Sequence, residues 1–209
     1  MIRLGLLITL ILALPLVFQL QPLEVLKLKT FDAFVAKQQP SGYFVTLNIT
    51  DEDVRSEGGW PFPRVRVGEI HQQLIDEGAL GVGWVISFID KDRFGGDFYL
   101  NRSFDIRDLP TVVAAFDANN GIYPEPVGTV ILGESAPGIS IGGYMPNIKE
   151  VAEVADQGIV SAPVDVDNLV RRIPLLFSIP DGWVPSFGTQ VLKSLVGADT
   201  YIIKTNEYG

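Results

Sequence analysis

The sequence contains no cysteine and only one histidine, His71, among its 209 residues. Disulfide scaffolds, thiol enzymes, Cys/His zinc sites and histidine-dependent catalysis at any other position are therefore excluded. Basic residues are also scarce, since 16 Lys and Arg stand against 25 Asp and Glu and the formal net charge is −9. Because binding to nucleic acid requires a basic surface that displaces phosphate counterions, we expect no nucleic-acid partner.

Apolar residues are abundant, at 47% of the chain, and they are concentrated at its start. Residues 4–23 are uncharged throughout and follow Arg3. A helix of this length spans a bilayer core of roughly 30 Å, so residues 1–23 are predicted to be a transmembrane signal anchor. The positive charge before the run places the N-terminus in the cytoplasm and the remainder outside the cell membrane, in the periplasm or the medium. A cleaved signal peptide and a buried core helix are the alternatives.

Residues 24–40 are predicted to be a juxtamembrane stalk helix that continues the membrane helix outward. Residues 38–42, which include Pro40 and Gly42, end it. The remaining residues, 41–209, are then one extracytoplasmic domain.

Alternating helix and strand patterns predict an α/β fold for this domain. A strand at 43–49 and a polar turn at 50–53 precede a helix that begins at Arg64 and stops at Gly78. The apolar run 80–89 is typical of a parallel strand covered on both faces, and the three elements form a βαβ unit.

The pattern continues to the end of the chain. A helix is predicted that Asp108 caps and residues 119–121 end, followed by a strand at 127–132 and a short helix after a capping box formed by Asn147 and Glu150. Residues 159–164 and 170–179 are predicted to pair as an antiparallel hairpin, and Ser186 to cap a last helix that Gly197 ends. The predicted fold is thus a mainly parallel sheet with helices on both faces, an antiparallel meander at one edge, and the N-terminal transmembrane and stalk helix in front.

Two motifs in this domain resemble those of a known family. Residues 59–64 read Gly-Trp-Pro-Phe-Pro-Arg, and residues 170–175 read Val-Arg-Arg-Ile-Pro-Leu, with Trp60, Pro61, Pro63, Arg64, Arg171, Arg172 and Pro174 as the motif residues. They are similar to motifs of the second type of CHASE domain, where Trp is usual in place of Phe62. The resemblance covers roughly residues 25–197, and Thr50 and Val85 stand where this family often has Asp.

The resemblance implies an extracellular sensing domain of a bacterial receptor in the cell membrane. In this family a cytoplasmic effector follows: a class III adenylate cyclase that makes cyclic AMP, a histidine kinase, a diguanylate cyclase or a Ser/Thr kinase. A homodimer is expected because these effectors work in pairs, and the signal would be a small molecule or an ion. A stand-alone membrane-anchored binding or scaffold protein is the alternative.

Acidic residues follow three of the predicted strands: Asp51 and Asp53, Asp90 and Asp92, and Glu134. Because ligands of open parallel sheets bind at the carboxyl ends of the strands, these residues predict a site for Ca²⁺, Mg²⁺ or a cationic ligand. The alternative is that Asp51 and Asp53 cap a turn and the others are solvated loop charges.

Three basic residues complete the candidates. Arg64 either anchors an anion at a helix N-terminus or pairs with an acidic turn and holds the Trp-Pro loop against the sheet. Arg171 and Arg172 are predicted in mid-strand, pointing to opposite faces, with one of them reaching Asp165 or Asp167. His71 is expected at the boundary of the core. We predict no catalytic residue, although a glycosidase that uses two carboxylates stays open.

Overall fold

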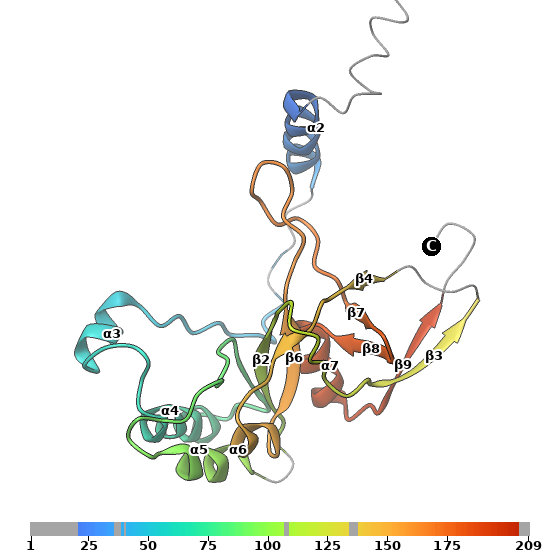
Figure 1. The fold of residues 1–209 in the computed structure, drawn as a ribbon. Helices are drawn as coiled ribbons and strands as arrows, with labels where there is room; N and C mark the ends of the chain where they lie inside the picture. Colours follow the sequence, from blue (N-terminus) through green and yellow to red (C-terminus); the bar gives the residue numbers. More distant parts are fainter. Residues whose placement is uncertain (1–20, 36–38, 40, 107–108, 134–137, 205–209) are drawn as a thin grey trace, which may run out of the picture. The chain divides into compact units, whose positions relative to one another are not determined.

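The computed structural model describes residues 21–35, 39, 41–106, 109–133 and 138–204 (Figure 1). The chain divides into two units. One unit contains the N-terminal part of the chain and the segment Pro163–Arg172, and the other contains Ile49–Ala162 and Ile173–Gly209.

The first unit contains one helix, α2 (Gln21–Phe34), within the range predicted to be helical. Leu28 is its buried residue. The other part of this unit, Pro163–Arg172, has no helix or strand and turns back on itself at Asn168, whose φ is +62°. Most of the predicted membrane span, residues 4–20, lies outside the described residues, and no helix among those described combines the length and the apolar character that crossing a bilayer requires.

The second unit is built around a four-stranded sheet. Its central strand, β2 (Thr111–Asp117), pairs in parallel with β1 (Val82–Trp84) and with β6 (Asp156–Val160). Because Val112 is the register partner of both Gly83 and Asp156, β1 and β6 lie on opposite edges of β2. A short strand, β5 (Tyr144–Met145), pairs antiparallel with the end of β2.

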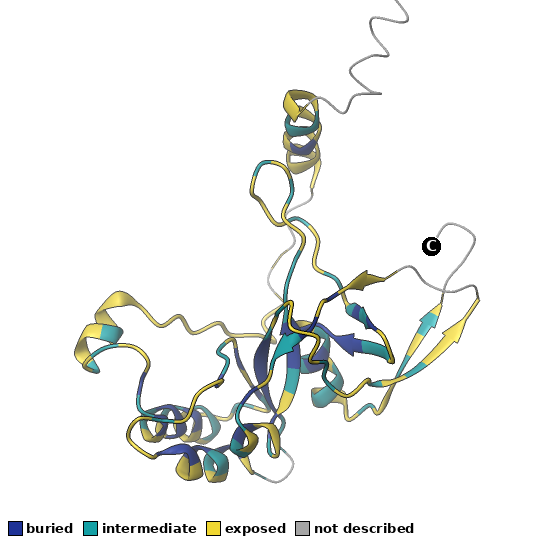
Figure 2. Ribbon diagram, viewed as in Figure 1, coloured by how far each residue is buried: buried dark blue, intermediate teal, exposed yellow. Residues whose placement is uncertain are grey.

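Helices cover both faces of this sheet. On one face, α4 (Arg64–Asp76), α5 (Asp97–Phe104) and α6 (Lys149–Ala152) contribute to one apolar cluster with Val82, Trp84 and Val113. On the other face, α7 (Phe187–Val196) contacts β6 and β2. The first five residues of β2, Thr111–Ala115, are all buried, because this part of the strand is covered on both sides; Figure 2 shows the buried residues of the central strand.

Glycines on the second face allow the close approach of α7. A Cβ at Gly83 would lie 3.0 Å from the ring of Phe187, and a Cβ at Gly158 would lie 2.4 Å from the Phe187 Cα. Val82 and Trp84, which alternate with the glycine along β1, point instead toward α4 and α5. The glycine in this apolar run therefore reflects a strand whose two faces have different neighbours.

Two smaller sheets complete the second unit. One contains β4 (Ile139–Ser140), β7 (Leu176–Ile179) and β8 (Gly182–Pro185), and the other pairs β3 (Gly128–Leu132) in parallel with β9 (Thr200–Lys204). A second buried cluster joins β7 and β8 to Ala115 and Ile159 of the large sheet.

The mixed α/β class and the helices at α4 and α7 are confirmed, and β7 pairs antiparallel with β8. The helix predicted after Asp108 is wrong, since these residues form β2. Val112, Val113 and Phe116 have helical spacing, but Thr111–Ala115 are all buried, as in a strand enclosed on both faces. No strand is present at 43–49, where every side chain is exposed.

The hairpin predicted from 159–164 and 170–179 is also wrong. Residues 156–160 form β6, whose partner is β2, and residues 161–175 have no strand. Asn147 does not cap α6. Its amide instead accepts the N–H of Phe88 at 2.5 Å and donates to the carbonyl of Ala114 at 3.0 Å, which ties the end of the β1 segment to β2.

Candidate functional site

The first candidate site surrounds Arg64, which begins α4 and has a side chain only 10% exposed. Its guanidinium donates a hydrogen bond to the carbonyl of Asp90 at 3.1 Å and lies over the ring of Phe88, 4.7 Å from the centroid. Its Nε lies 3.7 Å from a carboxylate oxygen of Asp97 and has no hydrogen-bond partner in the part of the chain that the structure describes. Burial lowers the pKa of Arg64, and the nearby carboxylates of Asp97, Asp92 and Asp90 oppose this shift.

The carboxylates around Arg64 organise the loop between β1 and α5. Asp97, at the start of α5, accepts the backbone N–H of Asp92 at 3.0 Å. Asp92 in turn accepts the N–H of Gly96 at 2.9 Å and the N–H of Arg64 at 3.4 Å. A Cβ at Gly96 would lie 2.9 Å from the Asp92 carboxylate, so glycine allows this loop to close. The polar groups of Asp92 and Asp97 are therefore engaged by the protein itself.

The Trp-Pro loop leads directly into this region. Phe62 is buried in the core, whereas Trp60 is half-exposed and packs edge-on against Phe62, with ring centroids 5.2 Å apart. The peptide bond between Trp60 and Pro61 is cis. Pro63 occupies the N-cap position of α4, and because its side chain has no acceptor atom it makes no capping hydrogen bond. The arrangement matches the interpretation in which Arg64 holds the Trp-Pro loop against an acidic loop.

The other predicted acidic residues do not join this cluster. Asp51 and Asp53 lie in the first turn of α3 (Asp51–Ser56), where Asp53 and Thr50 form a capping box. Hydrogen bonds from Thr50 lower the pKa of Asp53. Glu134 lies outside the described residues. Among the residues that the structure describes, no three His, Cys, Asp or Glu side chains converge as metal ligands, and the Ca²⁺ or Mg²⁺ site stays a prediction.

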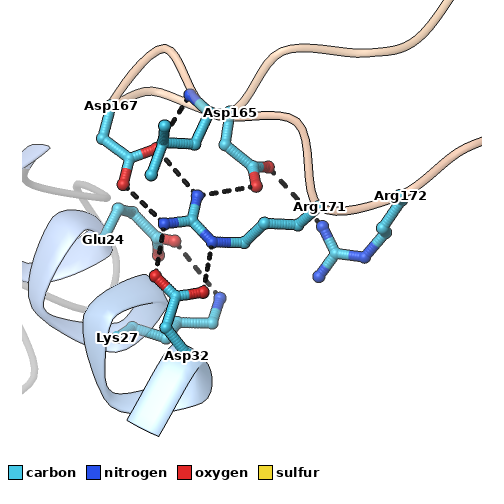
Figure 3. A network of polar contacts seen from close by, with 8 residues as sticks. Glu24, Lys27, Asp32, Asp165, Asp167, Arg171 and Arg172 are labelled. Carbon is cyan, nitrogen blue, oxygen red and sulfur yellow. Dashed lines mark hydrogen bonds and ion pairs between the residues drawn. The ribbon is translucent and has the colours of Figure 1, made fainter. Parts of the chain in front are cut away.

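The second candidate site belongs to the first unit and is centred on Arg171 (Figure 3). The guanidinium makes five hydrogen bonds to three carboxylates, and its side chain is only 6% exposed. Asp32 of α2 is bound by two of them, from Nε and Nη2, at 2.8 Å each. Asp167 accepts two at 2.8 and 2.7 Å, and Asp165 accepts one at 3.0 Å.

The electrostatics of this cluster follow from the charge-assisted hydrogen bonds. They lower the pKa of Asp167 to about 2 and lower the pKa of Asp32, and they raise the pKa of Arg171. Asp167, Asp32 and Arg171 are therefore ionised at neutral pH. Arg172 takes little part, since its side chain is 68% exposed and lies 3.5 Å from Asp165.

The prediction that one of the two arginines reaches Asp165 or Asp167 is confirmed for Arg171. The mid-strand placement of both is wrong, and Pro174 likewise lies between β6 and β7 in a segment without regular structure. Sequence reasoning missed Asp32 and Asp97. Asp32 is separated from Arg171 by 139 positions, and no local pattern links residues so far apart.

His71 is fully buried, not at the boundary of the core. The indole N–H of Trp84 donates to its Nδ1 at 3.1 Å, and its Nε2 lies 3.4 Å from the Thr111 hydroxyl. Since an indole N–H can only donate, Nδ1 carries no proton and Nε2 does. Burial lowers the pKa of His71 to about 4, so the ring is neutral at physiological pH.

The motif residues around Arg64 and Arg171 invite comparison with known proteins. A family model described as CHASE2 domain matches residues 6–206, nearly the whole chain. The chain belongs to the CHASE2 family. CHASE2 domains are extracellular sensory domains of receptors such as cyclases and kinases, and this chain is therefore a sensory domain of that kind. Comparisons with curated proteins and with solved structures found no match.

Proposed function

We propose that this CHASE2 chain is the extracytoplasmic input region of a membrane receptor that regulates a cytoplasmic effector, and that the effector is a class III adenylate cyclase. Family membership over residues 6–206 is the observation that carries the proposal. The uncharged run at residues 4–23 supports it, because a membrane anchor places the acidic domain on the far side of the bilayer.

A small molecule or an ion would act by binding one conformation of the domain more tightly than another. The shift in population cannot exceed the difference in affinity for the two states. The helix α2, which begins at the end of the predicted membrane segment, would carry the shift inward, and a homodimer would bring two effectors together. The loop that joins Asp90, Asp92 and Asp97 to Arg64 follows the carboxyl end of β1, which is the usual position of a ligand in a parallel sheet.

The test uses the native gene together with whatever sequence follows Gly209, expressed in cells that lack their own adenylate cyclase. We expect cyclic AMP to accumulate, and protease added to spheroplasts to digest the domain while the membrane stays intact. The control is the chain of residues 1–209 alone, which should be digested but should make no cyclic AMP.

Three results would count against the proposal. A domain that external protease cannot reach would refute the extracytoplasmic placement. An intact receptor that produces no cyclic AMP but autophosphorylates would show that the effector is a histidine kinase. A gene that ends near Gly209 would favour a membrane-anchored scaffold or binding protein.

A further inference from the structure

We infer that the ion pair between Asp32 and Arg171, here called the Asp32–Arg171 latch, is the contact through which the sensory domain holds and releases α2. This inference rests on the proposed function, in which α2 continues a membrane helix. The two side chains are joined by parallel hydrogen bonds of 2.8 Å, a geometry that fixes both distance and orientation.

The three carboxylates around Arg171 have different tasks. Asp165 and Asp167 belong to the same segment as Arg171, at sequence separations of six and four, so they hold the guanidinium in place whatever α2 does. Asp32 is the one carboxylate of this network that α2 supplies among the described residues. The guanidinium of Arg171 is therefore already held in position by Asp165 and Asp167, and Asp32 is the carboxylate that can dissociate from it.

The segment that carries Arg171 is itself held by local hydrogen bonds. The N–H of Asp165 donates to the carbonyl of Leu169 at 3.0 Å, and the N–H of Asn168 donates to the carbonyl of Asp165 at 2.9 Å. Asn168 adopts the left-handed conformation that closes the turn. A tight turn of this kind moves as one piece, so a displacement of its ends changes the position of the guanidinium.

Along the chain, this turn connects two sheets. Its segment, Pro163–Arg172, follows β6 of the large sheet and precedes β7 of the three-stranded sheet. In the proposed receptor, a change in how these two sheets pack would reach the segment through the two ends of its chain. On the other side, Asp32 is nine positions beyond Leu23, about 14 Å along a helix from the end of the predicted membrane span.

Exposure makes the latch reversible. The side chain of Asp32 is 44% exposed, whereas those of Asp165 and Asp167 are 21% and 13% exposed. When α2 leaves, Asp32 becomes hydrated and Arg171 keeps two carboxylates, so neither charge is left buried alone. The penalty that normally follows the breaking of a buried ion pair is thus avoided.

The test compares Asp32→Asn with Glu24→Gln in the full receptor, reconstituted in lipid nanodiscs. Both substitutions remove one negative charge from α2, but among the described residues Glu24 pairs only with Lys27 of the same helix. Residues 1–209 contain no cysteine, so once any cysteine in the sequence that follows them is replaced by serine, spin labels at Lys29→Cys and Val166→Cys report the distance between α2 and the turn. Both of these positions are exposed.

We expect one narrow distance distribution for the unsubstituted protein and for Glu24→Gln, and a broadened or shifted one for Asp32→Asn. Arg171→Gln should reproduce the change, and Arg172→Gln should not. Basal cyclic AMP output should change about fivefold or more in Asp32→Asn and stay constant in Glu24→Gln, as for an ordinary allosteric coupling.

An unchanged distance distribution in Asp32→Asn would overturn the latch. A changed distribution with unchanged output of an active receptor would overturn its role in coupling. A failure of the proposed function looks different, because the unsubstituted receptor would then produce no cyclic AMP or resist external protease. In that case the distance measurement still decides whether Asp32 holds α2.

Discussion

The single histidine provides the sharpest prediction about stability. His71 is fully buried, and burial lowers its pKa to about 4, against an ordinary value of 6.5. A histidine whose pKa is lowered in the folded state contributes stability above its unfolded pKa, and this contribution is lost as the pH falls toward the folded value. Acidification therefore destabilises the protein in the window between pH 6.5 and pH 4.

The magnitude follows from proton linkage. With pKa values of 6.5 unfolded and about 4 folded, the free energy of unfolding decreases by about 2 kcal/mol between pH 7 and pH 5. The contacts of His71 agree with the direction of its pKa shift. Protonation of Nδ1 would place the new hydrogen opposite the indole N–H of Trp84, which can only donate. The lowered pKa values of Asp32, Asp53, Asp167 and Glu150 affect stability as the pH falls through the ordinary carboxyl values of 3.8 and 4.5, below the range of pH 7 to pH 5.

The measurement has two parts. Urea unfolding of the purified chain in detergent, followed by circular dichroism from pH 7 to pH 5, gives the slope. His71→Gln removes the titrating group and should flatten the slope, although the variant starts from a lower stability. Because the chain contains one histidine, its imidazole gives one set of NMR signals and the folded pKa can be read directly. A midpoint near 6.5 with no loss of stability would refute the reasoning.

Two further substitutions test the packing around the sheet. Arg64→Met leaves Asp97 buried without its nearest guanidinium, so we expect urea denaturation to show that the free energy of unfolding falls by about 3 kcal/mol. The control Arg93→Met changes an exposed side chain in a loop and should alter the free energy of unfolding little. Equal effects of the two substitutions would contradict the structural role of Arg64. Gly158→Ala brings a Cβ to within 2.4 Å of the Phe187 Cα and should lower the free energy of unfolding by about 2 kcal/mol. The control Gly188→Ala, also at a glycine beside Phe187 but with open space around it, should raise the free energy of unfolding by about 0.5–1 kcal/mol. Thermal unfolding measures both variants, and equal effects would contradict the close contact at Gly158.

Local sequence signals were sufficient for several elements. The helix α4 was predicted from apolar positions at helical spacing, and α7 from the same spacing together with Gly197, which adopts the left-handed conformation after its last turn. The pairing of Arg171 with Asp165 and Asp167 was also accessible, because the residues are only four to six positions apart. These features depend on neighbours in the chain, and a neighbour is visible in the sequence.

The same reasoning failed where two periodicities compete. Residues 111–117 satisfy a helical apolar stripe, but their β-branched residues and the burial of Thr111–Ala115 are typical of a strand. The helix α5 was missed because acidic and glycine residues precede it and its apolar face is short. The first strand expected, at 43–49, has the composition of a strand but no paired neighbour in the structure.

By itself the sequence determined the CHASE2 family, the mixed α/β class and the residue types that two short motifs supply, because composition and close spacing are properties of the chain. Only the tertiary structure decided which carboxylates those motif arginines meet. Asp97 approaches Arg64 from another helix, and Asp32 reaches Arg171 across 139 positions. A charge has no preferred partner until folding brings one within a few ångströms, since the strength of an ion pair depends on distance and burial.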